Sequence, residues 1–172
     1  MGNRIKYLST ISILPNEVLD KDIVFVSKAA VTESTRLRLK DISYKVLPDI
    51  WDNYTKLKEG NVYIERLYRK LIHKIGYALN DIHKVDFPVS FWEIPMASWL
   101  LYFLPPLLDR YSRLERAVEL YGRENLILLA CRYKLEPYSS LPDFKEKMSV
   151  TEQSASAFNG EVARQMGITV KE

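Results

Sequence analysis

The residue of this sequence best suited to proton transfer is His83, which closes a predicted long helix. A histidine changes its charge near neutral pH, so it can take a proton from an attacking hydroxyl group as a general base. Asp109, which follows a double proline, is the second candidate catalytic residue. Each residue also has a structural interpretation, because a basic side chain suits the C-terminus of a helix and a carboxylate suits its N-terminus.

Arginine, amide, carboxylate and tryptophan side chains around these two positions could hold a sugar or a phosphate. Guanidinium groups contact phosphate through two hydrogen bonds at once, and flat aromatic faces pack against sugar rings. The candidate substrate-binding residues are Arg69, Asn80, Trp92, Glu93, Trp99 and Arg110. The structural alternatives are a solvated helix face for Arg69 and Asn80, and core packing for the two tryptophans.

Several common site motifs are absent from the sequence. The six glycines are too widely spaced for a G-x-G-x-x-G fingerprint or a P-loop, and neither G-x-S-x-G nor H-E-x-x-H occurs. His73 and His83 share one predicted helix at a separation of about 15 Å, which is too far for both to bind one metal ion. Asp20 and Asp22 precede a predicted strand instead of following it, so a solvated turn is favoured over a metal site. We therefore expect neither a metal ion nor a cofactor.

The elements that must position these residues begin with strands. The alternation in Tyr7–Leu14 predicts a strand, and the apolar runs Ile23–Val26 and Leu126–Ala130 predict two buried strands. A shorter strand is expected at Ser43–Leu47.

Helices account for most of the remaining pattern. Apolar residues at steps of three and four predict a long helix with Asn61 as its N-cap and His83 near its end. A second helix is expected from Trp92, with an interruption at Pro105 and Pro106 where a fresh helix starts.

Two further signals concern the end of this helical region and the tail. Gly122 should terminate the helix, and a weak final helix is expected over Ser154–Met166. The apolar run Met96–Leu108 is shorter than the roughly 20 residues that cross a bilayer, so it is interpreted as buried protein.

The order of these elements predicts an α/β fold with a small, mostly parallel sheet flanked by helices. With 172 residues, 47% of them hydrophobic and 27% charged, the chain is expected to form a single domain over 1–172. Its core would span about 5–131, and 132–172 would be a polar tail. The single cysteine, Cys131, and the lack of a visible signal peptide favour a cytoplasmic location. The net charge of +3 does not by itself indicate nucleic acid, and at most a peripheral membrane contact is expected.

Three segments in fixed order resemble a family of bacterial surface-carbohydrate transferases of the O-antigen type. The segments are LNDIH at Leu79–His83, FWEIPMASWL at Phe91–Leu100 and LDRY at Leu108–Tyr111. The matching residues are Asn80, His83, Trp92, Trp99, Leu100, Asp109, Arg110 and Tyr111. Glu93 stands where the family has arginine, which reverses a charge, and Ala97 and Ser98 replace a Gly-Pro pair.

The resemblance implies one half of a two-domain, glycosyltransferase-like fold that binds a nucleotide-sugar between its domains. This chain would be the N-terminal, acceptor-side part, with a glycan acceptor and a C-terminal donor domain as partners. His83 would take the proton of the acceptor hydroxyl while a cation, either Arg69 or Arg110, stabilises the leaving phosphate.

The alternative is a non-catalytic helical interaction module. An exposed apolar patch at 94–108 would favour the module. A pocket lined by His83, Trp92 and Arg110 would favour the transferase.

Overall fold

The computed structural model of the chain describes residues 4–12, 14–133, 140–144 and 152–172. They belong to two compact units. The first, here called the sheet unit, comprises Met1–Ile50 and Arg110–Glu172; the second, the hairpin unit, comprises Trp51–Asp109. The assignment of 1–172 to one domain stays a prediction.

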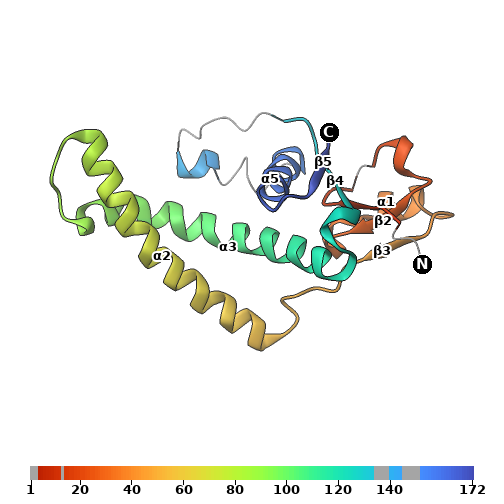
Figure 1. Ribbon diagram of the computed structural model, residues 1–172, viewed down its shortest axis with the longest axis horizontal. Coiled ribbons are helices and arrows are strands. Elements are labelled where there is room, and N and C mark those ends of the chain that lie inside the picture. The colour runs from red at the N-terminus through yellow and green to blue at the C-terminus, as the bar shows by residue number, and fades with distance from the viewer. Residues whose placement is uncertain (1–3, 13, 134–139, 145–151) are drawn as a thin grey trace. The chain divides into compact units, whose positions relative to one another are not determined.

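A five-stranded parallel sheet forms the centre of the sheet unit (Figure 1). The strands are β1 (Lys6–Ser9), β2 (Asp22–Phe25), β3 (Tyr44–Val46), β4 (Leu126–Leu129) and β5 (Thr169–Lys171). Their spatial order is β3-β2-β1-β4-β5, and all four neighbouring pairs are parallel. The structure thus confirms an α/β fold with a small parallel sheet flanked by helices.

Burial on both faces explains why the central strands are apolar runs. Leu8 of β1, Phe25 of β2 and Leu128 of β4 are all fully buried. A parallel sheet covered on both faces requires such continuous hydrophobic segments. The predicted strands at Ile23–Val26 and Leu126–Ala130 are therefore confirmed within one residue.

The first strand is shorter than the alternating pattern predicts. β1 ends at Ser9, whose hydroxyl donates to the carbonyl oxygen of Ile11 at 2.8 Å. This local hydrogen bond turns the chain immediately after the strand. The apolar residues Ile11 and Leu14 follow the strand and are both buried. They therefore contribute to the hydrophobic core and not to the pairing of strands.

The tail contributes more to the sheet than its polar composition indicates. Helix α5 (Glu152–Gln165) confirms the predicted final helix, and Gly167 follows it with a φ of 71°. Its packed face consists largely of small residues, among them Ser154, Ser156, Ala157 and Ala163. Strand β5, which follows Gly167, was not predicted, because three residues in a polar context give no clear strand signal.

The remaining short elements of the sheet unit connect the strands. Helix α1 (Glu33–Arg38) follows β2, with the side chain of Thr32 accepting from the backbone N–H of Thr35 as N-cap. Single turns of 3-10 helix occur at Asn16–Val18, Lys28–Ala30 and Arg123–Asn125.

Helix α2 (Tyr54–His83) begins about two turns earlier than predicted. The expectation that Asn61 caps it is wrong, because Asn53 is the N-cap and its side chain accepts from the backbone N–H of Lys56 at 3.2 Å. The end of the helix agrees with the prediction. His83 is the last helical residue, and Lys84 closes the helix in the left-handed conformation with a φ of 56°.

Helix α3 (Val89–Tyr121) runs without interruption through Pro105 and Pro106, so the predicted break there is wrong. A proline inside a helix removes the hydrogen bond to the carbonyl four residues earlier. Here those carbonyls belong to Leu101 and Tyr102, which are both exposed, so water can satisfy them. The helix ends before Gly122, whose φ of 78° confirms its predicted role.

In the hairpin unit α2 and the first part of α3 pack together around a small core. Ile72, Leu100 and Leu104 are buried there. The opposite face of α3 is exposed, since Ile94 keeps 79% and Leu101 57% of its surface accessible. The interpretation of 96–108 as buried protein therefore holds for only one side of the helix. Among the described residues, no helix combines the length and the hydropathy that a membrane crossing requires.

Candidate functional site

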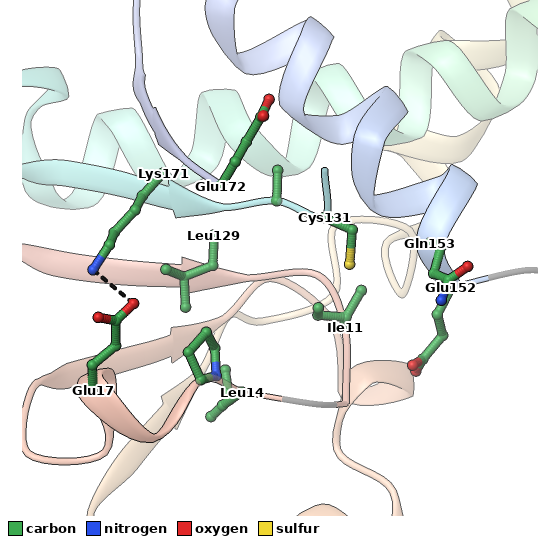
Figure 2. Close-up of a pocket in the computed structure, with 11 residues that line it drawn as sticks. Ile11, Leu14, Glu17, Leu129, Cys131, Glu152, Gln153, Lys171 and Glu172 are labelled. Carbon is green, nitrogen blue, oxygen red and sulfur yellow. Dashed lines mark ion pairs between the residues drawn. The ribbon is translucent and has the colours of Figure 1, made fainter. Parts of the chain in front are cut away.

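A pocket lies at the carboxyl edge of the sheet (Figure 2). Ser9 of β1, Leu129 of β4 and Lys171 of β5 end their strands side by side, in register. A cavity of about 520 Å³ opens beyond these ends. Its walls are formed by Ile11, Leu14, Pro15, Glu17, Leu129, Ala130, Cys131, Glu152, Gln153, Lys171 and Glu172.

The strand order places this pocket where open α/β sheets bind their ligands. From β1 the chain continues to β2 and β3 on one side, and it returns to β4 on the other side of β1. The crevice outside the carboxyl ends of two such strands is the topological switch point of a doubly wound sheet. We name this cavity the edge pocket.

The edge pocket has an apolar floor and an acidic rim. Ile11, Leu14 and Leu129 supply apolar surface. Figure 2 shows Glu17 and Lys171 at one end of the pocket, where their charged groups form an ion pair of 3.0 Å. Glu152 and Gln153 lie at the other end (Figure 2).

Only one of the three carboxylates in the rim lacks an ion-pair partner among the described residues. Glu17 is paired with Lys171, and Glu172 is paired with Arg164 and Arg132. Glu152 instead accepts two hydrogen bonds from Ser12, at 3.2 Å from the backbone N–H and 2.7 Å from the hydroxyl. The pocket therefore offers hydrogen-bond acceptors to a ligand, while its one lysine is already engaged.

The thiol of Cys131 stands in the wall of the edge pocket (Figure 2). Its backbone N–H donates to the hydroxyl of Ser156 in α5 at 2.9 Å, which fixes the segment after β4 against that helix. Cys131 is the single cysteine of the chain. It is half-buried and free, so it can report whether the pocket is occupied.

None of the pocket residues was a candidate from the sequence. The buried runs Ile23–Val26 and Leu126–Ala130 did predict the sheet, and ligands are expected at the carboxyl ends of its strands. The sequence did not predict that β1, β4 and β5 lie next to one another in the sheet. Strand β5 was not predicted at all, and hydrophobic periodicity contains no information on the order of strands.

Three of the candidate residues meet at the turn between α2 and α3. The indole N–H of Trp92 donates to Oδ1 of Asn80 at 2.6 Å, and the imidazole of His83 stacks on the Trp92 ring at 5.5 Å between centroids. Asn80 also donates to the carbonyl of Phe87 at 2.8 Å and accepts from the N–H of Phe87 at 3.2 Å. Asn80 thus stabilises the turn. Its contacts give a structural reason for the spacing of Asn80, His83 and Trp92, which was interpreted from the sequence as part of a functional site.

Glu93 and Arg69 also have partners within the hairpin unit. The phenol of Tyr68 donates to Oε1 of Glu93 at 2.7 Å. Burial, and then this contact with Glu93, raise the pKa of Tyr68 above its ordinary value of 10.0. Arg69 forms an exposed ion pair of 2.6 Å with Glu65 one turn away. It lies about 21 Å before His83 along the helix axis.

Asp109 lies in a second, smaller hollow within the hairpin unit. It accepts from the indole N–H of Trp51 at 2.5 Å. Both residues line a cavity of about 330 Å³ with Gly60, Pro105 and other apolar neighbours. Trp51 was not a candidate from the sequence, although its indole N–H donates to the carboxylate of Asp109, which was a candidate.

Arg110 and Trp99 complete the set of candidates. Arg110, in the sheet unit, places its guanidinium 5.0 Å from the ring centre of Phe158 in α5. Trp99, in the hairpin unit, is half-buried on α3. The structure therefore brings Asn80, His83 and Trp92 into contact, and it gives Arg69, Glu93, Asp109 and Arg110 partners of their own. Their assignment to catalysis or substrate binding stays a prediction.

Asp20 and Asp22, the two aspartates that precede β2 or begin it, are engaged in ion pairs. Asp20 pairs with Lys21 at 2.7 Å and Asp22 with Lys6 at 2.6 Å, and these bonds lower the pKa of both carboxyl groups. Both carboxylates lie at the amino end of β2, away from the carboxyl edge. Within the described ranges, no group of three or more His, Cys, Asp or Glu side chains could hold a metal ion.

Comparison with known protein families gives one match, which covers most of the chain. Residues 9–151 match a family described as LIC12162 family transferase. No curated protein and no solved structure matches the chain. The matched range begins at the last residue of β1 and includes strands β2 to β4 and both long helices.

Proposed function

We propose, from the premise that this chain belongs to the LIC12162 family of transferases, that it takes part in glycosyl-type transfer during bacterial cell-surface polysaccharide assembly. The observation that carries the proposal is the edge pocket, which lies at the switch point of the sheet. The resemblance of the segments around His83, Trp92 and Asp109 to surface-carbohydrate transferases supports the same reaction class.

The charge of the edge pocket favours the glycan acceptor over the nucleotide-sugar donor. Sugar hydroxyl groups donate well to carboxylates such as Glu152. A diphosphate would face Glu17, Glu152 and Glu172 with no unpaired lysine or arginine in the described wall. This supports the acceptor-side role, with the donor bound on a further domain.

Modification of Cys131 by a thiol reagent tests this proposal, because the chain has no other cysteine. A neutral oligosaccharide acceptor bound in the edge pocket should slow the modification, and a nucleotide-sugar such as UDP-glucose should slow it far less. Equal rates with and without every oligosaccharide would contradict an acceptor site. Stronger protection by the nucleotide-sugar would assign the pocket to the donor.

Two variants provide a matched comparison for the same assay. Glu152→Gln keeps an acceptor for Ser12 but removes the charge, and it should weaken protection by about tenfold. Glu115→Gln makes the same change at an exposed position of α3 that lines none of the described pockets, and it should leave protection unchanged.

His83 belongs to the hairpin unit and does not line the edge pocket, so its role as the general base of the transfer is proposed from the family resemblance alone. With a donor and an acceptor that bind, His83→Ala should lower kcat by about 10²- to 10⁴-fold. Trp92→Phe keeps an aromatic surface for the imidazole and should lower kcat far less. If His83→Ala changes stability but leaves kcat intact, the histidine only packs on Trp92.

A second candidate function, a helical interaction module, is favoured by the outer face of α3. Phe91, Ile94, Leu101 and Tyr102 recur at helical spacing on this face, and all are exposed. Exposed apolar side chains that gather on one helix face can mark an interaction site. Ile94→Ser with Leu101→Ser should abolish partner binding without affecting ligand protection of Cys131.

A further inference from the structure

A line of basic and aromatic side chains follows the outer face of α2. Tyr63, Arg66, Lys70, Lys74 and Tyr77 recur at steps of three and four residues, so they share one side of the helix. We call this line the basic stripe. It extends over about 21 Å. All five residues are exposed, with 54% of Tyr63 and 67% of Tyr77 accessible.

The positive charge of the basic stripe is not neutralised within the described part of the chain. Glu65, the acidic residue closest in sequence, pairs with Arg69 on another side of the helix. No ion pair involves Arg66, Lys70 or Lys74 among the described residues. Glu59 and Asp81 lie beyond the two ends of the stripe, and Asp81 pairs with Lys84 at 3.0 Å.

The opposite side of α2 is committed to packing. Ile72 is buried against Leu100 and Leu104 of α3, and Gly76 lies beside Val89 and Trp92. The basic stripe therefore faces away from the core of the hairpin unit. Surplus cations on an outward face are complementary to an extended anionic partner.

We propose that the basic stripe docks this protein on the surface of an anionic lipid bilayer. The three cations of the basic stripe are complementary to the negative charge of anionic lipid headgroups, and clusters of basic residues are attracted to such membrane surfaces. Tyrosine is enriched at such interfaces because its ring is apolar and its hydroxyl is polar. Double-stranded nucleic acid fits less well, because groove readers present base-contacting side chains on a more strongly basic surface.

Vesicle sedimentation of the complete chain tests the proposal. The protein should bind vesicles of equimolar phosphatidylcholine and phosphatidylglycerol, and it should bind pure phosphatidylcholine far more weakly. Each basic side chain near an anionic surface contributes about fivefold to the partition coefficient. The triple variant Arg66→Gln, Lys70→Gln, Lys74→Gln should therefore bind about 100-fold more weakly. High salt should also weaken the binding of the wild-type protein to anionic vesicles. The reason is that the Debye length falls to about 3 Å at 1 M ionic strength.

A charge-matched control lies in the sheet unit. Lys28, Lys40 and Lys45 are exposed and form no ion pair among the described residues, so their replacement by Gln removes the same net charge from another surface. This control should bind the anionic vesicles within a few-fold of wild type. Circular dichroism of both variants should show unchanged helix content, because glutamine is a good helix former.

Three results would overturn the proposal. The first is equal binding to anionic and neutral vesicles. The second is an equal loss of binding in the control and in the stripe variant. The third is displacement from vesicles by a short DNA duplex that the stripe variant no longer binds, which would assign the stripe to nucleic acid. The thiol assay at Cys131 tests the ligand site in the edge pocket, and vesicle sedimentation tests the basic stripe. The failure of one proposal can therefore be distinguished from the failure of the other.

Discussion

At the scale of single residues, the hairpin turn shows how one side chain can account for a sequence motif. Asn80 makes three hydrogen bonds, two to the backbone of Phe87 and one to the indole of Trp92. The chain leaves α2 at Lys84 and enters α3 at Val89, so these bonds bridge the whole connection. His83 and Trp92 owe their contact to this arrangement, whatever chemistry they perform.

Replacement of Asn80 by Ala should destabilise the hairpin unit by about 1–3 kcal/mol. The variant leaves polar groups of Phe87 and Trp92 without their partner, and each unsatisfied group carries a desolvation cost. Asn61→Ala is the control, since it removes an exposed amide on the same helix and improves helix propensity. Urea unfolding followed by tryptophan fluorescence measures both. Equal midpoints would show that the three bonds do not hold the turn.

The pair of Tyr68 and Glu93 should make stability depend on alkaline pH. The pKa of Tyr68 is raised in the folded state by burial and by Glu93. The stabilisation is therefore fully present below the ordinary value of 10.0, and it is lost as pH rises through the folded value. Above pH 10 the unfolding free energy of the wild type should fall more steeply than that of Tyr68→Phe.

Ultraviolet titration of the phenolate gives a second measurement of the same pair. In Glu93→Gln one tyrosine should ionise at lower pH than in the wild type, because the negative charge beside its hydroxyl is gone. An unchanged titration curve would mean that burial alone raises the pKa of Tyr68.

At the scale of elements, α2 and α3 are long helices that tolerate residues usually excluded from helix interiors. Glycine occurs twice inside α2, at Gly60 and Gly76, and proline three times inside α3. Pro105 does little harm because it faces solvent, together with the carbonyl it leaves free. The two glycines differ in what surrounds them, so they should respond differently to a methyl group.

Gly76→Ala should stabilise the hairpin unit by about 0.5–1 kcal/mol. Alanine has the higher helix propensity, and a Cβ atom at this position would meet Val89 at 3.5 Å and Trp92 at 3.6 Å, which are ordinary contacts. Gly60→Ala should gain less or lose stability, because its Cβ would come within 3.1 Å of the Trp51 ring. Thermal unfolding by circular dichroism compares the two. Equal gains would contradict the close contact at Trp51.

At the scale of the whole molecule, the two units carry separate spectroscopic reporters. Trp51, Trp92 and Trp99 all belong to the hairpin unit, while Cys131 belongs to the sheet unit. Tryptophan fluorescence and thiol exposure can therefore follow the unfolding of the two units in one sample.

Leu128→Ala should destabilise the sheet unit by about 2–5 kcal/mol, since Leu128 is fully buried in β4 and its loss leaves a cavity. Leu37→Ala, at a position with 70% exposure, should change stability by less than about 0.5 kcal/mol. The stability of both variants is measured by labelling Cys131 at increasing denaturant concentration. Similar unfolding midpoints for Leu128→Ala and Leu37→Ala would rule out a central role for Leu128. A parallel shift of the tryptophan transition would support one cooperative domain over 1–172.

Local patterns of the sequence determined much of this protein. Apolar runs identified β2 and β4 because a strand buried on both faces needs them. Helical periodicity identified most of α2 and α5, and Gly122 marked the end of α3, because each signal depends only on neighbouring residues. The family resemblance likewise rested on short segments, and the match over residues 9–151 confirms a transferase family.

Tertiary structure decided the rest. Strand order, the recruitment of β5 and the meeting of Glu17, Cys131, Glu152 and Lys171 at one edge all join segments far apart in the chain. No periodicity records such long-range pairings, since they depend on which surfaces are buried together. The same reason explains α3, where solvent on one side of the helix allows the chain to continue through two prolines that alone predict a break.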